Sequence, residues 1–294
     1  MQLTNDTLTN REIVSCWRLG EQLTGGRWYD IYRAAPKTYS FDSNHDFIIK
    51  LIHTNLDYDQ RCLAIDRMAR EAQATEQLNH PNIIRLLDAG LDQAPFFLVQ
   101  PWIEGRSLDR LFSQAPHLSL SRVLWVIRQI AEGIKAGHEK GRAFLGLDPS
   151  HVMVGKTGRI TLIGWSHSHA FRDKVSIIPN SHQLARYTAP ECFSNEYRVQ
   201  PSSDVYSLGV LIHQIFSIQA PFAGESIPQI RQSHRDLIPE DLIFSQPDCP
   251  QALGRLVKQM LSKNPEVRPT MREVLNSLIG VEIEHLSDLT PIVL

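Results

Sequence analysis

The period of the hydrophobic pattern changes once along this chain, close to Gly105. Before that glycine, short runs rich in β-branched and aromatic residues surround a single stretch, 65–78, whose apolar residues recur at helical spacing. The β-like runs are residues 31–34, 47–52, 83–87 and 96–99. Such a pattern predicts a small antiparallel sheet packed against one helix.

After Gly105 the apolar residues recur mainly with the period of an α-helix. The helical stretches are residues 118–140, 204–216, 253–261 and 271–278. Pro265 and Pro269 separate the last two, because proline cannot continue a helix. The second part is therefore predicted to be mainly helical, and the fold class of the whole chain is α+β.

Composition places the chain among ordinary globular proteins. Its 294 residues, 42% hydrophobic and 21% charged, are enough to bury a sizeable core in one two-lobed domain or two small ones. The formal net charge of -2 gives no field that would attract a polyanion. We therefore expect neither nucleic acid nor an acidic membrane surface as a primary partner.

The four cysteines lie far apart in the sequence and form no C-x-x-C pair; they are Cys16, Cys62, Cys192 and Cys249. This spacing favours neither a disulfide framework nor a thiolate zinc site. Residues 1–11 are polar, and no apolar run approaches the ~20 residues that a membrane-spanning helix needs. The sequence thus predicts a cytoplasmic protein.

The first part holds the sequence F-I-I-K, which ends at Lys50, and Glu71, which stands nine residues before an H-P-N-I turn. These residues resemble motifs of the protein kinase family: F-I-I-K is similar to the family's V-A-I-K strand, and Glu71 stands where the family places its αC glutamate. Residues 97–105 are similar to the hinge between the family's lobes, with Gln100 at the gatekeeper position and Ile103 within the hinge. The resemblance implies an ion pair between Lys50 and Glu71.

The second part carries further motifs in the family's order. They are A-P-E ending at Glu191, D-V-Y-S-L-G beginning at Asp204, and N-P-E-V-R-P-T containing Arg268. In the family, the glutamate of the first motif pairs with the arginine of the last. The resemblance therefore implies an ion pair between Glu191 and Arg268 that fixes the activation segment to the rest of the second part.

Together the motifs span residues 17–278 and resemble a bilobal protein kinase fold of the bacterial serine/threonine type. The resemblance implies a single kinase-like domain over residues 1–294. Its N-lobe, an antiparallel β-sheet with the αC helix, would cover about 12–103, and its mainly helical C-lobe about 104–280. Residues 281–294 would form a tail.

The three positions that should carry kinase chemistry hold other residues. The catalytic-loop motif H-R-D-L-K-P-x-N aligns with F-L-G-L-D-P-S-H at 144–151, so Gly146 replaces the catalytic aspartate and His151 the metal-binding asparagine. The D-F-G motif aligns with G-W-S, so Gly164 replaces the second metal ligand. Imidazole is a poor ligand for magnesium. We therefore expect a pseudokinase with no catalytic residue, no metal site and no enzymatic activity.

The nucleotide pocket that the resemblance implies is degenerate. The glycine-rich loop aligns with T-G-G-R-W-Y-D-I at 24–31, where side chains in place of glycine would obstruct the approach of backbone amides to phosphate. Ile48 replaces the small residue that lines the family's adenine slot, and its extra methylenes crowd that slot. The vestigial pocket comprises Lys50, Glu71, Gly26, Ile31, Ile48, Gln100, Ile103 and Met153.

Some residues admit two interpretations. Asp148, where the family has a lysine, is either a displaced general base or a surface or capping carboxylate. His151 with His167 and His169 is either a transition-metal site or a group of solvated histidines, and the missing third ligand at helical spacing favours the second. A last set falls where the family stacks its regulatory spine and is predicted to be core: Phe144, Trp165, Thr75 and Leu86.

Three hypotheses on function follow. The first is a pseudokinase scaffold or regulatory domain that needs no cofactor and binds a protein partner, such as an active kinase or a signalling complex. The second is an atypical serine/threonine kinase or nucleotidyl transferase that uses Asp148 and Glu71 in new roles. The third is a nucleotide-responsive switch in which Lys50 and Glu71 bind ATP without magnesium. The substituted positions favour the first.

Overall fold

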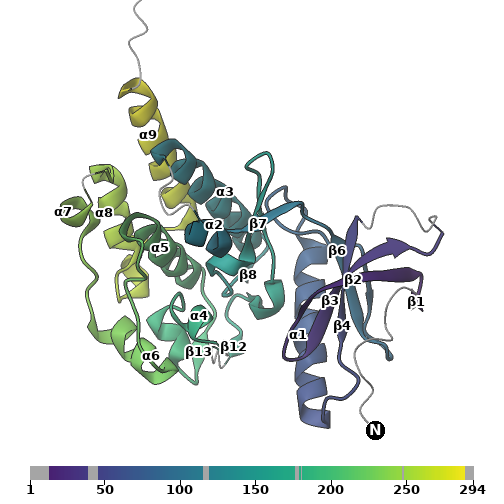
Figure 1. The fold of residues 1–294 in the computed structure, drawn as a ribbon. Helices are drawn as coiled ribbons and strands as arrows, with labels where there is room; N and C mark the ends of the chain where they lie inside the picture. The colour runs from purple at the N-terminus through teal and green to yellow at the C-terminus, as the bar shows by residue number, and fades with distance from the viewer. Residues whose placement is uncertain are drawn as a thin grey trace, which may run out of the picture. The chain divides into compact units, whose positions relative to one another are not determined.

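The computed structural model describes residues 13–38, 46–114, 119–175, 179, 181–246 and 248–288. It divides into two compact units (Figure 1). The N-terminal unit holds the chain up to Asn79 together with Ile84–Glu104, and the C-terminal unit holds His80–Ile83 and the chain from Gly105 onward. The α+β fold expected from the sequence, with a sheet-rich part followed by a helical part, is confirmed.

The N-terminal unit is built on one antiparallel sheet whose strand order is β1-β2-β3-β4-β6-β5. Its strands are β1 (Ile13–Val14), β2 (Trp17–Gly25), β3 (Tyr29–Pro36), β4 (Phe47–Ile52), β5 (Asp88–Gly90) and β6 (Phe97–Pro101). Successive side chains of a strand point to opposite faces. Ile49 and Val99 therefore pack with Trp17 on one face, whereas Ile52 and Leu98 pack on the other.

A single long helix, α1 (Tyr58–Gln77), covers the face that carries Ile52 and Leu98. It begins at Asp57, whose carboxylate accepts a hydrogen bond of 2.8 Å from the N–H of Gln60 and so satisfies a free amide of the first turn. Ala64, Met68 and Ala72 recur at helical spacing and are buried in the same cluster. The sequence placed this helix correctly but started it seven residues late.

The C-terminal unit consists mainly of helices, as the period after Gly105 indicated. They are α2 (Leu108–Gln114), α3 (Leu120–Glu139), α4 (His182–Ala185), α5 (Ser202–Ser217), α6 (Ile227–Asp236), α7 (Leu242–Ser245), α8 (Gln251–Met260) and α9 (Met271–Asp288). The long helix α5 is buried over nearly its whole length and forms the centre of the unit. None of the helices in the described ranges has both the length and the apolarity needed to cross a membrane.

Short strands in the C-terminal unit hold the loops in which the catalytic positions lie. One sheet joins β7 (Gly105–Ser107), β9 (Val152–Gly155) and β10 (Ile160–Leu162). Two strand pairs join β8 (Arg142–Ala143) to β11 (His169–Ala170) and β12 (Lys174–Val175) to β13 (Tyr197–Arg198). The helix α9 continues to Asp288, so the first part of the expected tail is helical, while 289–294 lie outside the described residues.

The segment His80–Ile83 belongs to the C-terminal unit although the chain on both sides of it belongs to the N-terminal unit. The side-chain amide of Asn82 donates to Oε1 of Gln129 at 3.0 Å and to the carbonyl of Ile160 at 2.8 Å. The backbone carbonyl of Asn82 accepts from the N–H of Leu162 at 2.8 Å. Because Asn82 is buried, these bonds satisfy polar groups that water does not reach.

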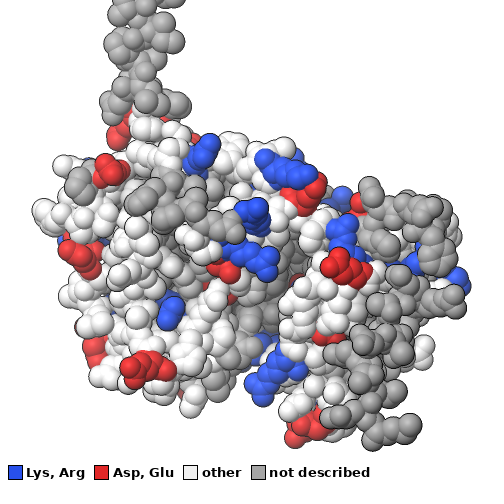
Figure 2. Space-filling model, viewed as in Figure 1, with Lys and Arg blue, Asp and Glu red and all other residues white. Residues whose placement is uncertain are grey.

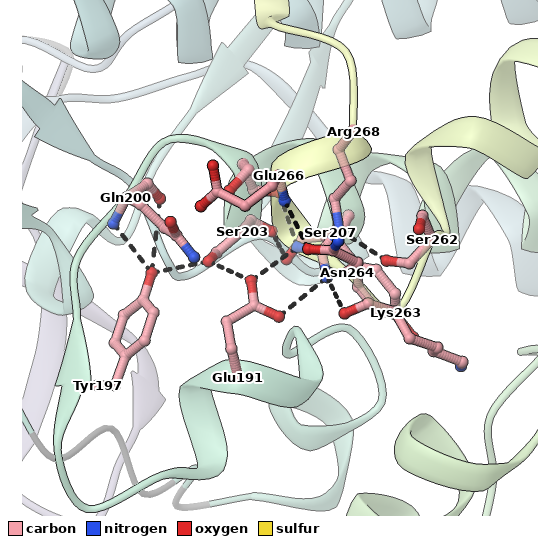
Figure 3. A network of polar contacts seen from close by, with 12 residues as sticks. Glu191, Tyr197, Gln200, Ser203, Ser207, Ser262, Lys263, Asn264, Glu266 and Arg268 are labelled. Atoms are coloured by element: carbon pink, nitrogen blue, oxygen red, sulfur yellow. Dashed lines mark hydrogen bonds and ion pairs between the residues drawn. The ribbon is translucent and has the colours of Figure 1, made fainter.

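The predicted ion pair between Glu191 and Arg268 is present (Figure 3). The guanidinium of Arg268 donates to both carboxylate oxygens of Glu191, at 2.6 and 2.9 Å, and its side chain is fully buried. Ser203 at the start of α5 donates a third hydrogen bond of 2.6 Å to the same carboxylate. This bidentate geometry ties the A-P-E segment to α5 and to the chain before α9.

Candidate functional site

The predicted ion pair between Lys50 and Glu71 is formed inside the N-terminal unit. Nζ of Lys50 on β4 donates to Oε1 of Glu71 on α1 at 2.5 Å, and both side chains are buried. Gln100 on β6 donates to the same oxygen at 3.2 Å. Burial lowers the pKa of Lys50, but attraction to Glu71 and Tyr29 and the hydrogen bond to Glu71 together outweigh it, so the net pKa is raised. The lysine therefore stays charged and holds α1 against the sheet.

Strand register places four predicted pocket residues on one face of the sheet. Ile31 lies opposite Lys50 in the β3–β4 pair, and Ile48 lies opposite Gln100 in the β4–β6 pair. Cross-strand neighbours share a face, and residues two apart along a strand share it too. Ile31, Ile48, Lys50 and Gln100 therefore point to the side that α1 covers.

The remaining predicted pocket residues are distributed over both units. Ile103 follows β6 and is half-buried in the N-terminal unit. Met153 lies on β9 of the C-terminal unit and is half-buried as well. Gly26 is in the turn between β2 and β3.

The turn that corresponds to the glycine-rich loop is closed on itself. The N–H of Gly26 donates to the carbonyl of Tyr29 at 2.9 Å, so this amide already has a partner. Trp28 is only 6% exposed and packs against Met68 and Ala72 of α1. The Tyr29 ring has its centroid 5.8 Å from Nζ of Lys50. The loop thus buries one aromatic side chain against α1 and places a second one beside the ion pair.

Sequence reasoning missed the inward position of Trp28. A large aromatic residue in the turn between two strands could have indicated this position, because such a side chain is rarely left in water when a hydrophobic face is near. Tyr29, whose side chain we expected to obstruct phosphate, lies beside Lys50.

Asp204 at the start of α5 fixes the loop that carries the catalytic positions. Its fully buried carboxylate accepts hydrogen bonds from the N–H groups of Phe144 at 2.8 Å and Leu145 at 2.7 Å. A ring nitrogen of His138 lies 2.8 Å from the same carboxylate. Leu145 has a φ of 54°, a strained value for a branched residue that these bonds hold in place. The sequence showed Asp204 only as a fold motif.

The three substituted catalytic positions lie together in the C-terminal unit. Nδ1 of His151 donates to the carbonyl of Gly146 at 2.6 Å. Gly164 has a φ of 75°, and a Cβ atom at this position would lie only 2.5 Å from Cδ2 of His151. The imidazole therefore occupies the space in which a side chain of residue 164 would begin. A Cβ at Gly146 would meet its nearest atom, the carbonyl oxygen of Gly164, at 3.3 Å.

Asp148 is buried and acts as a cap. Its carboxylate accepts hydrogen bonds from the N–H of Ser150 at 2.7 Å and from Nε2 of Gln183 at 3.1 Å. Oδ2 of Asp148 lies 3.2 Å from Nδ1 of His151. The carboxylate thus caps the turn at Pro149–His151 and is not at the surface, and its contact with His151 keeps a carboxylate in the site.

The residues at the family's metal positions do not fit magnesium. Magnesium requires oxygen ligands in octahedral geometry, whereas these positions provide two glycines and an imidazole whose Nδ1 is already hydrogen-bonded. Across the described ranges, no three or more histidine, cysteine, aspartate or glutamate side chains are grouped so as to hold a metal ion. The three histidines 151, 167 and 169 therefore form no such group.

Part of the predicted spine is packed in the C-terminal unit. The Phe144 and Trp165 rings lie 4.6 Å apart between centroids and are fully buried. Trp165 presses on α3, where a Cβ at Gly137 would come within 3.0 Å of the indole. Thr75 and Leu86 belong to the N-terminal unit, in which Thr75 is buried and Leu86 packs beside the α1 cluster.

Comparison with known proteins agrees with this arrangement of residues. Residues 34–278 match the family model described as protein kinase domain. The chain is 26% identical over 275 residues to the probable serine/threonine-protein kinase PknB of Lactococcus lactis, covering 92% of this chain and 41% of that protein. It is 28% identical over 211 residues to the serine/threonine-protein kinase PknA of Mycobacterium tuberculosis, covering 69% of this chain and 48% of that protein.

These relatives correct one expectation from the sequence. We expected no enzyme because Gly146, His151 and Gly164 replace the family's catalytic and metal-binding residues, but the relatives are named as serine/threonine-protein kinases, which points to an enzyme. The chain spans less than half the length of these relatives.

Proposed function

This chain belongs to the protein kinase family, and on that premise we propose that it serves serine/threonine-kinase signalling as a regulatory domain that binds a protein partner. The partner class we propose is an active kinase or a signalling complex.

One observation carries the proposal: at the positions where the family has its nucleotide-binding and catalytic residues, the polar groups of this chain are hydrogen-bonded to one another. In the N-terminal unit, Lys50, Glu71 and Gln100 form a closed buried network. In the C-terminal unit, His151 bonds to Gly146 and packs on Gly164. Buried groups that satisfy each other stabilise a single arrangement, which is what a fixed binding surface requires.

A second candidate function is phosphoryl transfer by rearranged residues, and Asp148 is the observation that favours it. This carboxylate is buried in the catalytic loop and lies 3.2 Å from His151. A carboxylate near a histidine can accept a proton from a substrate hydroxyl. The names of the relatives support this candidate as well.

A thermal-shift titration with ATP separates the two candidates. The wild-type chain, a Lys50→Ala variant and a Lys140→Ala control would be titrated with and without magnesium or manganese, and each shift would be measured against the same variant without nucleotide. A ligand of dissociation constant Kd stabilises by RT ln(1 + [L]/Kd). Lys140 is exposed in the C-terminal unit, so its variant tests the effect of losing any surface lysine.

For a regulatory domain that needs no nucleotide we expect the same melting temperature at every ATP concentration. A metal-independent rise that Lys50→Ala abolishes would support a nucleotide switch in place of a cofactor-free domain. A metal-dependent rise, together with transfer of labelled phosphate that Asp148→Asn abolishes, would overturn the proposal in favour of the second candidate.

A further inference from the structure

Three arginines gather where the β2–β3 turn meets α1 in the N-terminal unit. Arg27 is exposed in the turn, and Arg67 and Arg70 are half-buried on the helix. Basic side chains are visible in the space-filling view where the turn and α1 lie in Figure 1 (Figure 2). None of these arginines is used by the kinase-like site described above.

Trp28 forms a fixed platform for two of these cations. The guanidinium carbon of Arg67 lies 4.5 Å from the centroid of the indole ring, and that of Arg27 lies 5.5 Å from it. Trp28 is buried against α1, so the ring cannot rotate freely. Cation–π contact orients a guanidinium over the ring face and leaves its N–H edge available for hydrogen bonds.

The positive charge at this place is only partly balanced. Arg70 is paired with Asp66, one turn earlier on the helix. Among the described residues, no carboxylate forms an ion pair with Arg67 or Arg27. Burial lowers the pKa of Arg67, and repulsion from Arg70 and Arg27 adds to this, while Tyr29 and Asp66 oppose it. A bound anion would relieve this repulsion.

We propose that Arg27 and Arg67, oriented by Trp28, bind the phosphate of a phosphorylated serine or threonine on a partner polypeptide. A phosphate carries close to two negative charges and three acceptor oxygens, which suits two guanidinium groups better than a single carboxylate does. That the phosphate belongs to a polypeptide rests on the proposed protein-binding function.

The test is calorimetric titration of the full chain with a pool of short peptides that carry one central phosphoserine, beside the same pool with serine. We expect the phosphorylated pool to bind at least tenfold more tightly. Arg27→Gln and Arg67→Gln should each weaken binding about tenfold, since each removes a charge-assisted hydrogen bond. Arg85→Gln, at an exposed arginine of the same unit, should leave the affinity unchanged.

Equal affinity for both pools, or unchanged binding in Arg27→Gln, would overturn the inference. Arg27 is exposed in a turn, so its variant keeps the test valid if Arg67→Gln does not fold. Loss of binding in Lys50→Ala with both arginine variants unaffected would place the phosphate in the kinase-like pocket and also overturn it. If ATP has no effect on melting and the peptide pools bind alike, the regulatory proposal stands and only the arginine site falls.

Discussion

His151 and Gly164 depend on each other sterically. The imidazole lies where the Cβ of residue 164 would stand, at a contact of 2.5 Å that real Cβ atoms do not make. An aspartate begins with the same Cβ atom, so restoring the family residue at 164 alone meets the ring. The metal-binding asparagine and aspartate of the family have therefore been replaced here by a complementary pair.

A double-mutant cycle tests this dependence. We expect Gly164→Ala to lower the free energy of unfolding by roughly 2–4 kcal/mol, from overpacking together with backbone strain at positive φ. In a His151→Asn background the same change should cost less, with a coupling of about 1–3 kcal/mol measured by urea unfolding. Gly146→Ala is the matched control, because its Cβ has no contact under 3.0 Å. Additive effects would show that the ring moves aside freely.

At the scale of elements, His234 joins three helices of the C-terminal unit. The hydroxyl of Tyr206 on α5 lies 2.9 Å from Nδ1 of His234 on α6, and Nε2 donates to the carbonyl of Ala185 on α4 at 3.0 Å. These two bonds assign the neutral tautomer with the proton on Nε2. Burial and nearby Lys263 lower the pKa of His234 from 6.5 to about 3.

This histidine predicts acid sensitivity. A lowered pKa means that its contribution to stability is full above the unfolded value of 6.5 and is lost as pH falls from there toward about 3. We expect His234 to lower the free energy of unfolding by about 1.4 kcal/mol for each pH unit below 6.5. The His234→Gln variant should lack this contribution, so its stability should fall less steeply with pH. Urea unfolding from pH 7 to pH 4.5 gives both slopes. Parallel slopes would show that carboxylates alone cause the acid response.

Sequence reasoning predicted the elements and contacts that are fixed by local periodicity or by motif order. The helical periods of α3 and α5, and the pairs Lys50–Glu71 and Glu191–Arg268, are confirmed in this way. The two-residue strands β8 and β11 were missed because a period cannot be seen in so short a run. The packing of His151 on Gly164 depends on contacts between loops distant in sequence, which no local pattern reports.

At the scale of the whole molecule, the chain passes between its two units at 79/80, at 83/84 and at 104/105. The short middle segment contributes Asn82 to the core of the C-terminal unit. We expect Asn82→Ala to lower the stability of that unit by about 2–4 kcal/mol, because the Ile160 carbonyl loses a buried donor and Oε1 of Gln129 keeps only the N–H of Ile160. Hydrogen exchange would report the loss in β10 and α3, with unchanged protection in β4 and β6. Equal loss in both units would contradict the assignment of this segment.

The position of Asn82 also limits how such proteins can be recombined. A chimera joined at residue 104 would import the four residues His80–Ile83 from the donor of the first unit, while their partners at Gln129, Ile160 and Leu162 came from the other parent. The two units therefore cannot be exchanged independently at residue 104, and a successful exchange must keep Asn82 together with its partners Gln129, Ile160 and Leu162.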